Sequence, residues 1–231
     1  MALRPIFYDT ETTGVRADKD RIIELAAYDP VRNLTFEKLI NPGSPIPAEA
    51  TAIHHITNEM VANAPSFSEI ASEFVTFCEG DVCLIAHNND AFDIHFLRNE
   101  FTRVELTFPT QWKFFDTLKW SRRYRCDLPR HTLQFLREIY GIPSNNAHRA
   151  LDDVIVLHEV FKNMTDDLPM DIVYNLLNKP REIQHMPFGK HQGVPLAQVP
   201  KSYVKWLAES GAFDKAENAE LKNCFEKIGS L

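Results

Sequence analysis

The chain has 231 residues, of which 44% are hydrophobic and 25% are charged. This is the composition of a globular protein, and it excludes a disordered, collagen-like or fibrous chain. No apolar run approaches the roughly 20 residues that span a bilayer, and the polar, acidic N-terminus does not resemble a signal peptide. The four cysteines contain no C-x-x-C pair, so we expect reduced thiols in a cytoplasmic protein.

Charge is unevenly distributed along the chain. The net charge is −7, from 25 basic and 32 acidic residues, which argues against a protein that coats nucleic acid through bulk charge. Between residues 111 and 137, however, there are seven basic residues and only two acidic ones. This stretch is consistent either with a grip on a polyanion or with a solvated helix face.

Strand-forming segments come first in the chain. The sequence predicts strands over 3–9, 21–28 and 33–40, and their short connections favour an antiparallel meander. A loop rich in Pro and Gly follows at 41–47.

Helices and strands alternate after this loop. Residues 66–78 have helical spacing, and Ser66 with Glu69 forms a capping-box pattern. An apolar run at 82–86 predicts a buried strand, and residues 114–115 predict a strand end. Further helices are expected over 91–101, 117–124, 131–140, 148–164 and from Pro169 onward. This order indicates an α/β fold with a mixed sheet flanked by helices.

Pro180 marks a predicted boundary between two domains, 1–180 and 181–231. The tail has seven basic and six acidic residues, a net charge of +1, which leaves −8 for the rest of the chain. Its Gly and Pro turn signals predict a small module of a β-hairpin plus a helix, with Tyr203 and Trp206 in its core. The alternative to this packing role is a grip on duplex or a dimer contact through three lysines: Lys190, Lys201 and Lys205.

Two acidic residues lie near the end of the first predicted strand. Asp9 and Glu11 are two positions apart, so their side chains point to the same face of the sheet. Two carboxylates on one face repel each other unless a cation lies between them, and Mg²⁺ or Mn²⁺ prefers such oxygen ligands. The alternative is a pair of solvated acids.

A second acidic segment follows the buried strand at 82–86. Asp93 shares a helical stripe with Phe96, Leu97 and Glu100, so it is expected to face inward, where a carboxylate needs a partner or a metal. Asp90, or Asn89 beside it, lies where an N-cap belongs, and capping is a sufficient explanation for Asp90. We therefore prefer Asp93 as a metal ligand.

Helical phase separates the two adjacent aspartates of a third segment. Asp153 continues into an apolar stripe through Leu157, whereas Asp152 continues into a polar stripe through Glu159. Asp153 is therefore expected to point toward the core. His148 precedes the helix in a loop, and its ordinary pKa near 6.5 suits it to take a proton from water at neutral pH.

Three motifs together resemble those of the DEDDh 3′→5′ exonucleases, the DnaQ-like nucleases with a ribonuclease H-like fold. They are D-x-E-T-T-G from Asp9, A-H-N-x-x-x-F-D ending at Asp93, and H-R-A-L-D-D from His148 to Asp153. The resemblance covers residues 3 to about 164. It implies four carboxylate ligands, Asp9, Glu11, Asp93 and Asp153, and His148 as the general base.

The tail adds a second resemblance. The segment 188–193, followed by Tyr203 and Trp206, is similar to the C-terminal segment of exonuclease X-like enzymes, which implies DNA as the substrate. One departure is that His87 and Asp93 are six positions apart, where those sequences usually have five. The longer spacing is found elsewhere in the family.

The expected reaction is hydrolysis of the terminal phosphodiester of a strand, with release of nucleoside 5′-monophosphates. Two divalent cations, Mg²⁺ or Mn²⁺, would clamp the scissile phosphate, and His148 would take the proton from the attacking water. Backbone N–H groups of Thr12, Thr13 and Gly14 are expected to bind the strand end. Further candidate substrate contacts are His54 and Ile56, from an I-H-x-I-T segment, and Arg122, Arg123 and Arg125 for upstream phosphates.

Three alternatives remain at this point. The same residues would serve a 3′→5′ exoribonuclease, because acceptance of a 2′-hydroxyl needs only one more hydrogen bond. A proofreading subunit that mainly binds a DNA polymerase is the second, and a catalytically inactive adaptor is the third. Relatives are often homodimers, which the resemblance carries over as an implication. We expect no Cys/His zinc site, given the spacing of these residues.

Overall fold

A mixed five-stranded sheet forms the centre of residues 1–177 in the computed structural model, which describes residues 3–143, 150–166, 168–180, 183–215 and 218–231. The strands are β1 (Arg4–Thr12), β2 (Ile22–Asp29), β3 (Leu34–Leu39), β4 (Val82–Ala86) and β5 (Lys113–Asp116). Their order is β3-β2-β1-β4-β5. β2 is antiparallel to β1 and β3, whereas β4 is parallel to β1 and β5. The predicted meander and mixed sheet are confirmed.

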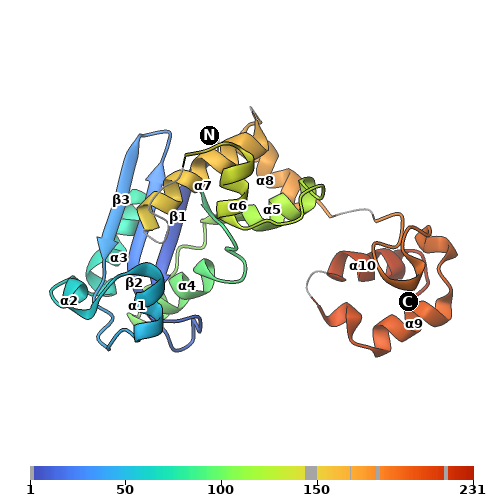
Figure 1. Ribbon diagram of the computed structural model, residues 1–231, viewed down its shortest axis with the longest axis horizontal. Coiled ribbons are helices and arrows are strands. Elements are labelled where there is room, and N and C mark those ends of the chain that lie inside the picture. Colours follow the sequence, from blue (N-terminus) through green and yellow to red (C-terminus); the bar gives the residue numbers. More distant parts are fainter. Residues whose placement is uncertain (1–2, 144–149, 167, 181–182, 216–217) are drawn as a thin grey trace. The chain divides into compact units, whose positions relative to one another are not determined.

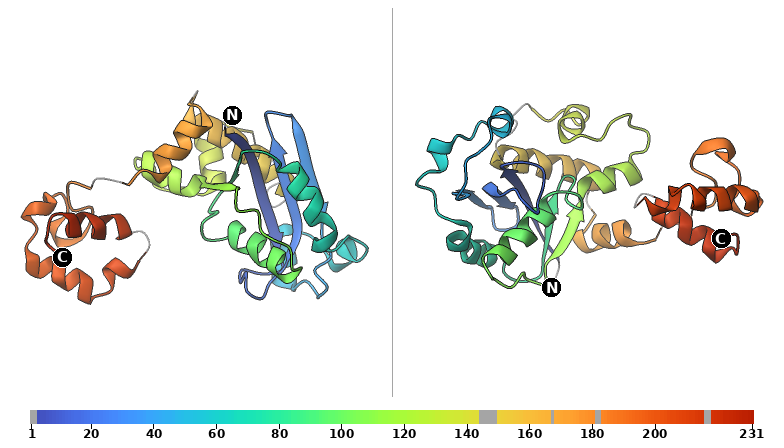
Figure 2. Two further views of the ribbon diagram at one scale, coloured as in Figure 1. Left: turned by 180° about the vertical axis from the view of Figure 1, so that it is seen from behind. Right: turned by 90° about the horizontal axis from the view of Figure 1, so that it is seen from below.

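Helices cover both faces of this sheet (Figures 1 and 2). On one face lie α3 (Phe67–Phe77) and α4 (Asp93–Arg103), which pack on Tyr8 of β1. On the other face α7 (Ala150–Thr165) packs on Phe7. The flanking helices are α5 (Thr117–Tyr124), α6 (Leu133–Ile139) and α8 (Met170–Asn178). Because neighbouring strand residues point to opposite faces, Phe7 and Tyr8 fill both cores, and each is almost fully buried.

Two short helices were not expected from the sequence. They are α1 (Ala48–His54) and α2 (Asn58–Val61), which lie toward the end of the sheet opposite the N-terminus (Figure 1). Seven and four residues are too few to show a helical period. The first ends at His55, which has a left-handed conformation with φ of 61°.

Helix boundaries confirm one predicted cap and correct another. The Glu69 carboxylate accepts hydrogen bonds from the Ser66 N–H and hydroxyl, so the predicted capping box is present at the start of α3. The expectation that Asp90 caps α4 was wrong. The helix begins only at Asp93, and Asp90 forms a surface ion pair with Lys119. The polar turn after β4 is therefore longer than the sequence indicated.

A buried carboxylate anchors the loop that follows β1. Glu100 of α4 is fully buried and receives the Arg21 guanidinium through two bonds of 2.7 and 2.9 Å. Arg103 adds a third contact at 3.0 Å and donates to the carbonyls of Ala17 and Asp20. These bonds tie the 13–21 loop to α4. Glu100 therefore faces inward, as its stripe predicted.

Residues 178–231 form a second unit with its own core. It contains the helices α9 (Lys201–Glu209) and α10 (Ala219–Lys227) and three short 3-10 turns, η1 (Gly189–His191), η2 (Leu196–Gln198) and η3 (Ala212–Asp214). The predicted hairpin is reduced to an antiparallel bridge between His185 and Pro195, with backbone bonds that join residues 184–186 to 193–196, and the described residues here form no strand. Proline lacks the N–H that a ladder needs, and Gly189 and Gly193 have positive φ, which interrupts extended strands.

No described helix combines the length and apolar character needed to cross a membrane. All four cysteines are free thiols. The thiols of Cys78 and Cys83 are buried, and burial raises their pKa above the ordinary value.

Candidate active site

The candidate site lies at the carboxyl end of β1. The parallel ladder with β4 ends where Phe7 pairs with Ile85, but β1 continues to Thr12. In this extension Asp9 and Glu11 pair only with β2, and they point to the face that α7 covers. The sheet end is therefore open to side chains that come from the turn after β4. Carboxyl ends of parallel strands are where α/β sheets usually bind ligands.

Asp93 comes from that turn. It is the first residue of α4 and is only 2% exposed. The Thr10 hydroxyl donates a 2.8 Å hydrogen bond to its Oδ1. Burial raises the pKa of Asp93 to about 7, although the Thr10 bond opposes this shift. A neighbouring strand residue thus fixes the inward orientation that the helical stripe predicted.

Asp9 is the centre of the acidic group. Burial raises its pKa well above the ordinary value, and the charges of Asp93, Glu11 and Asp153 raise that pKa further. These three side chains come from α4, β1 and α7, so the structure brings the four predicted carboxylates into one electrostatic neighbourhood. Asp153 is half-buried and accepts a 3.2 Å bond from the Gln134 amide of α6. His148 lies outside the described residues.

One acidic residue at this site was not expected from the sequence. Glu24 of β2 is fully buried, pairs with Glu11 across the sheet and also raises the pKa of Asp9. Its Oε2 accepts a 3.1 Å hydrogen bond from the Ala150 N–H at the start of α7. Glu24 therefore holds the helix end that carries Asp153. The available signal was the one charged residue in the otherwise apolar run of residues 22–28.

A second polar group holds the turn after β4. The Asp116 carboxylate accepts bonds from the N–H groups of Asn88 and Asp90, both at 3.0 Å, and caps α5. His87 lies between the His131 carbonyl, 2.8 Å from its Nε2, and the Thr117 hydroxyl, 2.9 Å from its Nδ1. Burial lowers the pKa of His87 to about 4, so its ring is neutral at neutral pH.

The expected contacts in the first motif are partly used by the fold itself. The Thr13 N–H donates to the Arg21 carbonyl at 2.9 Å, and the Thr12 hydroxyl donates to the Gly14 carbonyl. A Cβ on Gly14 would lie 2.5 Å from the Asp20 carboxylate, so a larger residue here would displace the side chain that accepts the Arg16 N–H. Approach of a substrate is therefore not needed to explain it.

The structure also corrects the expected contacts in the 52–57 segment. His54 and Ile56 are 2% and 0% exposed, and His54 Nδ1 accepts a 3.0 Å bond from the Ile56 N–H. Both were expected to touch substrate, but neither reaches the surface. Ile53 does reach it, with 57% exposure. Ile53 lies on the last turn of α1, whereas Ile56 follows the helix and packs in a small buried cluster with Ile23, Ile46 and Val61.

Only one of the three expected phosphate-binding arginines lacks a structural role among the described residues. Arg123 donates to the Leu177 carbonyl at 2.8 Å, and Arg125 pairs with Asp127 and the Tyr140 hydroxyl. Arg122 is exposed, has no hydrogen bond or ion pair in the described parts of the chain, and lowers the pKa of the neighbouring His87. Of the three arginines, Arg122 therefore stays the candidate for contact with an upstream phosphate.

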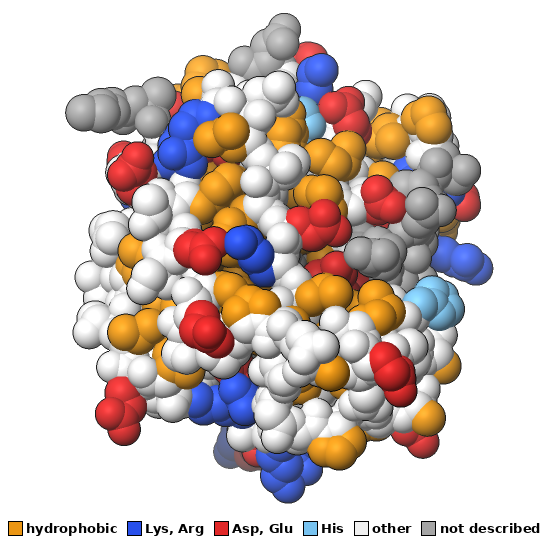
Figure 3. All heavy atoms as spheres, turned by 90° about the vertical axis from the view of Figure 1, so that its left-hand side faces the viewer, with side chains coloured by type: hydrophobic (Ala, Val, Ile, Leu, Met, Phe, Trp, Pro, Cys, Tyr) orange, Lys and Arg blue, Asp and Glu red, His pale blue; other side chains and the backbone are white. Residues whose placement is uncertain are grey.

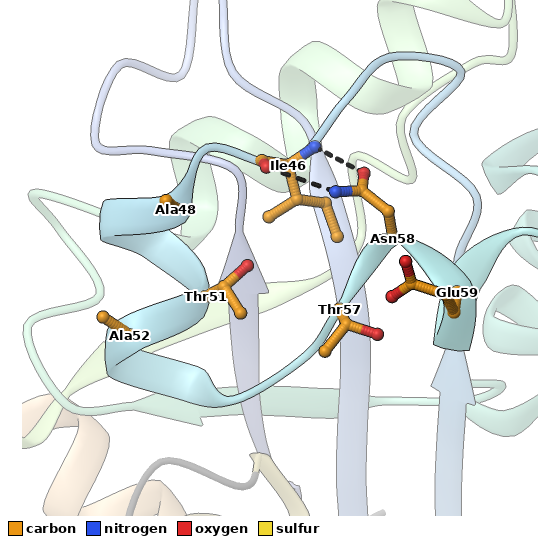
Figure 4. A pocket seen from close by; sticks show the side chains of 7 residues that line it. All are labelled: Ile46, Ala48, Thr51, Ala52, Thr57, Asn58 and Glu59. Atoms are coloured by element: carbon orange, nitrogen blue, oxygen red, sulfur yellow. Dashed lines mark hydrogen bonds between the residues drawn. The ribbon is translucent and has the colours of Figure 1, made fainter.

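A surface pocket of about 380 Å³ lies along the α1–α2 segment. Figure 4 shows its lining, including Thr51, Thr57 and Glu59, and the two hydrogen bonds between Asn58 and the Ile46 backbone. None of the four site carboxylates lines this pocket. Figure 3 shows one face of the molecule, with Asp and Glu side chains scattered across it and Lys and Arg side chains mostly toward the top and bottom.

The donor set fits a divalent cation. Within the described ranges, no three His, Cys, Asp or Glu side chains lie close enough together to form a ready-made metal cage. The carboxylates nevertheless raise the pKa of Asp9 by mutual repulsion, and a cation would replace this repulsion by attraction. All of these donors are oxygens, as Mg²⁺ and Mn²⁺ prefer.

Comparison with known proteins agrees with this site. The model of a family described as exonuclease, RNase T, matches residues 6–161, which contain all four carboxylates. The chain belongs to this exonuclease family. The resemblance to DnaQ-like 3′→5′ exonucleases that the three motifs carry is thereby confirmed.

Two relatives of this exonuclease-family chain cover most of the same region. Exonuclease DPD1, chloroplastic/mitochondrial, from Arabidopsis thaliana is 36% identical over 74% of this chain. The chain spans 58% of that protein's length. DNA polymerase III subunit epsilon from Treponema pallidum is 40% identical, over 68% of this chain and 74% of that protein.

Solved structures show the same fold. Exonuclease I of E. coli, in a complex with single-stranded DNA, aligns with a TM-score of 0.65 and 22% identity, over 76% of this chain and 43% of that chain. Exonuclease X, in complex with 5′ overhanging duplex DNA, aligns with a TM-score of 0.57 and 22% identity. The alignment covers 75% of this chain and 99% of that chain. The predicted ribonuclease H-like α/β fold is confirmed. Residues 179–227 match a separate family, described as a putative quorum-sensing-regulated virulence factor.

The pKa shifts of this exonuclease domain predict a pH-dependent effect of Mg²⁺ on stability. Without metal, the folded state holds the Asp93 proton with a pKa of about 7 against an ordinary 3.8. The folded state therefore binds more protons than the unfolded state between these values, and stability falls as pH rises through that window. Mg²⁺ binds the ionised carboxylates, so it should raise the melting temperature more at about pH 8 than at about pH 5.

Thermal melts with Mg²⁺ and with EDTA at both pH values measure this difference. The Asp93→Asn variant is the control, because it removes the titrating group and should reduce the pH dependence. An equal effect of Mg²⁺ at the two pH values would contradict the prediction.

Proposed function

We propose that this chain is a metal-dependent 3′→5′ exonuclease that hydrolyses terminal phosphodiesters of DNA and releases nucleoside 5′-monophosphates. The observation that carries the proposal is that Asp9 and Glu11 at the end of β1, Asp93 at the start of α4 and Asp153 in the first turn of α7 are brought close enough for their charges to act on Asp9. The names of the relatives, an exonuclease and a DNA polymerase subunit, support this activity. The DNA complexes of the structural neighbours support DNA as the substrate.

Each site residue has a proposed role. Asp9, Glu11, Asp93 and Asp153 would hold two divalent cations, Mg²⁺ or Mn²⁺, which supply stabilisation of negative charge on the phosphate. His148 would accept the proton of the attacking water. Glu24 holds the start of α7, and Gln134 orients the Asp153 carboxylate.

The proposed substrate contacts are chosen by the exposure of the side chains and by their charge. Ile53 is the exposed apolar side chain of its segment and would contact the terminal base. Arg122 would contact an upstream phosphate, because it has no carboxylate partner among the described residues. Backbone N–H groups of Thr12 and Gly14 are the remaining candidates in the first motif.

Matched single-stranded DNA and RNA oligomers, labelled at the 5′ end and digested with Mg²⁺, test the activity and the substrate. We expect a ladder of products shortened from the 3′ end, and we expect DNA to be degraded faster than RNA, in line with the DNA complexes of the structural neighbours. Faster digestion of RNA would favour the exoribonuclease instead. Internal cuts, or intact oligomers, would overturn the proposal.

A proofreading subunit is the second candidate, and the similarity to the Treponema epsilon subunit favours it. In that case the chain would bind a DNA polymerase. Co-purification of a polymerase with the tagged chain, retained at physiological salt, tests this candidate, and activity of the isolated chain does not decide it. The homodimer stays a prediction that sedimentation would check.

A further inference from the structure

Three aromatic rings form a row on the small C-terminal unit. The His191 ring meets the Tyr203 ring edge-on, with centroids 4.6 Å apart. The Tyr203 ring stacks on Trp206, with centroids 5.5 Å apart and an interplanar angle of 24°. We call His191, Tyr203 and Trp206 the aromatic row.

The local backbone is built to support this row. Gly189 has a φ of +75°, and a Cβ there would lie 2.5 Å from the Tyr203 hydroxyl. Only glycine combines this left-handed conformation with so close an approach. The segment 188–193, which the sequence singled out, thus lies against Tyr203, the middle ring of the row.

Trp206 is not a core residue, contrary to our expectation. Its neighbours Val204 and Leu207 on α9 are buried in the core of the unit, but Trp206 is 55% exposed. A single exposed apolar residue needs no explanation. Here, however, a large exposed ring continues a stacked row, which is the arrangement of a binding surface for another flat ring.

The charges beside the row select the class of partner. Lys190 lies between Gly189 and His191 in the chain, is exposed, and forms no ion pair within the described residues. Lys201 donates only to the Gly229 carbonyl, at 3.2 Å, among those residues. Lys205 has a weak, exposed contact of 3.8 Å with Glu209. Residues 181–231 carry a net charge of +1 in a chain of −7, so the partner that fits is anionic and carries aromatic rings.

We propose that the aromatic row binds the bases of single-stranded nucleic acid, with Lys190 in contact with a phosphate. Bases stack on exposed aromatic side chains without regard to sequence, and lysines beside them neutralise the backbone. The small unit then retains the strand whose 3′ end the exonuclease domain shortens. This last step rests on the proposed function, whereas binding itself does not.

Binding of a fluorescein-labelled oligothymidylate to the full chain, followed by fluorescence anisotropy in EDTA, tests the proposal. Trp206→Ala should weaken binding about tenfold, the size expected for the loss of one stacked base, and Trp206→Phe should retain most of the affinity. Lys190→Gln should reduce the slope of log K against log salt by about 1. Ile228→Ala is the matched control, because Ile228 is a comparably exposed apolar residue of the same unit.

Equal affinities of Trp206→Ala and Ile228→Ala would overturn the proposal. Self-association that Trp206→Ala abolishes, with unchanged oligonucleotide affinity, would also overturn it and assign the row to a second copy of the chain. Thermal melts accompany each variant, and Trp206→Phe keeps the comparison valid if the alanine variant unfolds.

Hydrolysis of the p-nitrophenyl ester of thymidine 5′-monophosphate, measured with Mg²⁺, separates this proposal from the proposed function. The ester is too short to need the row, so the row variants should hydrolyse it at the wild-type rate. A wild-type chain that binds the oligomer but hydrolyses neither substrate would refute the proposed exonuclease activity and would not contradict binding by the aromatic row. Normal hydrolysis together with unchanged oligomer binding in Trp206→Ala would refute only the proposal that the aromatic row binds nucleic acid.

Discussion

Replacement of Asp9 by Asn is expected to slow nucleotide release by on the order of a thousandfold, because loss of a central cation ligand removes several kcal/mol of transition-state stabilisation. The fold should survive, because Asn is isosteric and the raised pKa of Asp9 marks its ionised form as unfavourable in the metal-free protein. Initial rates on single-stranded DNA, together with thermal melts, measure both effects.

The two aspartates of α7 provide the internal control for this experiment. Asp153→Asn should lose activity nearly as severely as Asp9→Asn, because the Asp153 charge acts on Asp9. Asp152→Asn should retain activity within about twofold, since helical phase turns Asp152 away from the apolar stripe that Asp153 begins. Both side chains are half-buried and adjacent in sequence, so a general disturbance of the helix would affect them equally. Equal losses would contradict the assignment of Asp153 as the ligand.

Removal of the Arg21 guanidinium is expected to cause the largest loss of stability. Arg21→Leu leaves the fully buried Glu100 carboxylate with Arg103 as its remaining ionic partner among the described residues. Breaking a buried pair in this way costs about 3–5 kcal/mol, and the continued contact with Arg103 favours the lower end of that range. Urea denaturation measures the change in the free energy of unfolding.

Arg16→Leu is the matched control for this substitution. Arg16 pairs with Asp18 at 3.2 Å in the same loop, but both side chains are mostly exposed. Such a pair contributes about 0–1 kcal/mol, so the control should unfold almost as the wild type does. A loss below about 1 kcal/mol in Arg21→Leu would show that Glu100 is tolerated without its main partner.

The positions of the four carboxylates could be predicted from the sequence because the period of the strand or helix that carries each one indicates which way its side chain points. Alternation along β1 puts Asp9 and Glu11 on one face, and helical stripes turn Asp93 and Asp153 inward. Strand alternation and helical stripes depend only on neighbours along the chain. They therefore hold before any tertiary contact is known.

Contacts between distant segments explain most of the failures. Glu24 acquires its role from the Ala150 N–H, which is 126 positions away in the chain. Arg123 is held by the Leu177 carbonyl, also far away in the chain. A basic run in the sequence cannot show which of its members tertiary structure will occupy.

Other failures arise where an element is too short for a periodic signal. Ile56 was expected to contact substrate but is buried, whereas Ile53 is exposed, because α1 is only seven residues long and gives no periodic signal for the segment that follows it. Trp206 was expected in the core from its neighbours Tyr203 and Leu207, but its place on the helix leaves it in solvent. Amphipathic spacing alone does not show whether an aromatic residue at the border of the apolar face is buried in the core or exposed on the surface.

The central claim is that carboxylates from three segments together hold divalent cations at the end of β1. Titration of the full chain with Mn²⁺, followed by electron paramagnetic resonance in the presence of thymidine 5′-monophosphate, tests it most directly. The account predicts about two bound ions per chain in the wild type and a clear loss of binding in Asp9→Asn. Absence of bound Mn²⁺ in the wild type, or unchanged binding in Asp9→Asn, would contradict it.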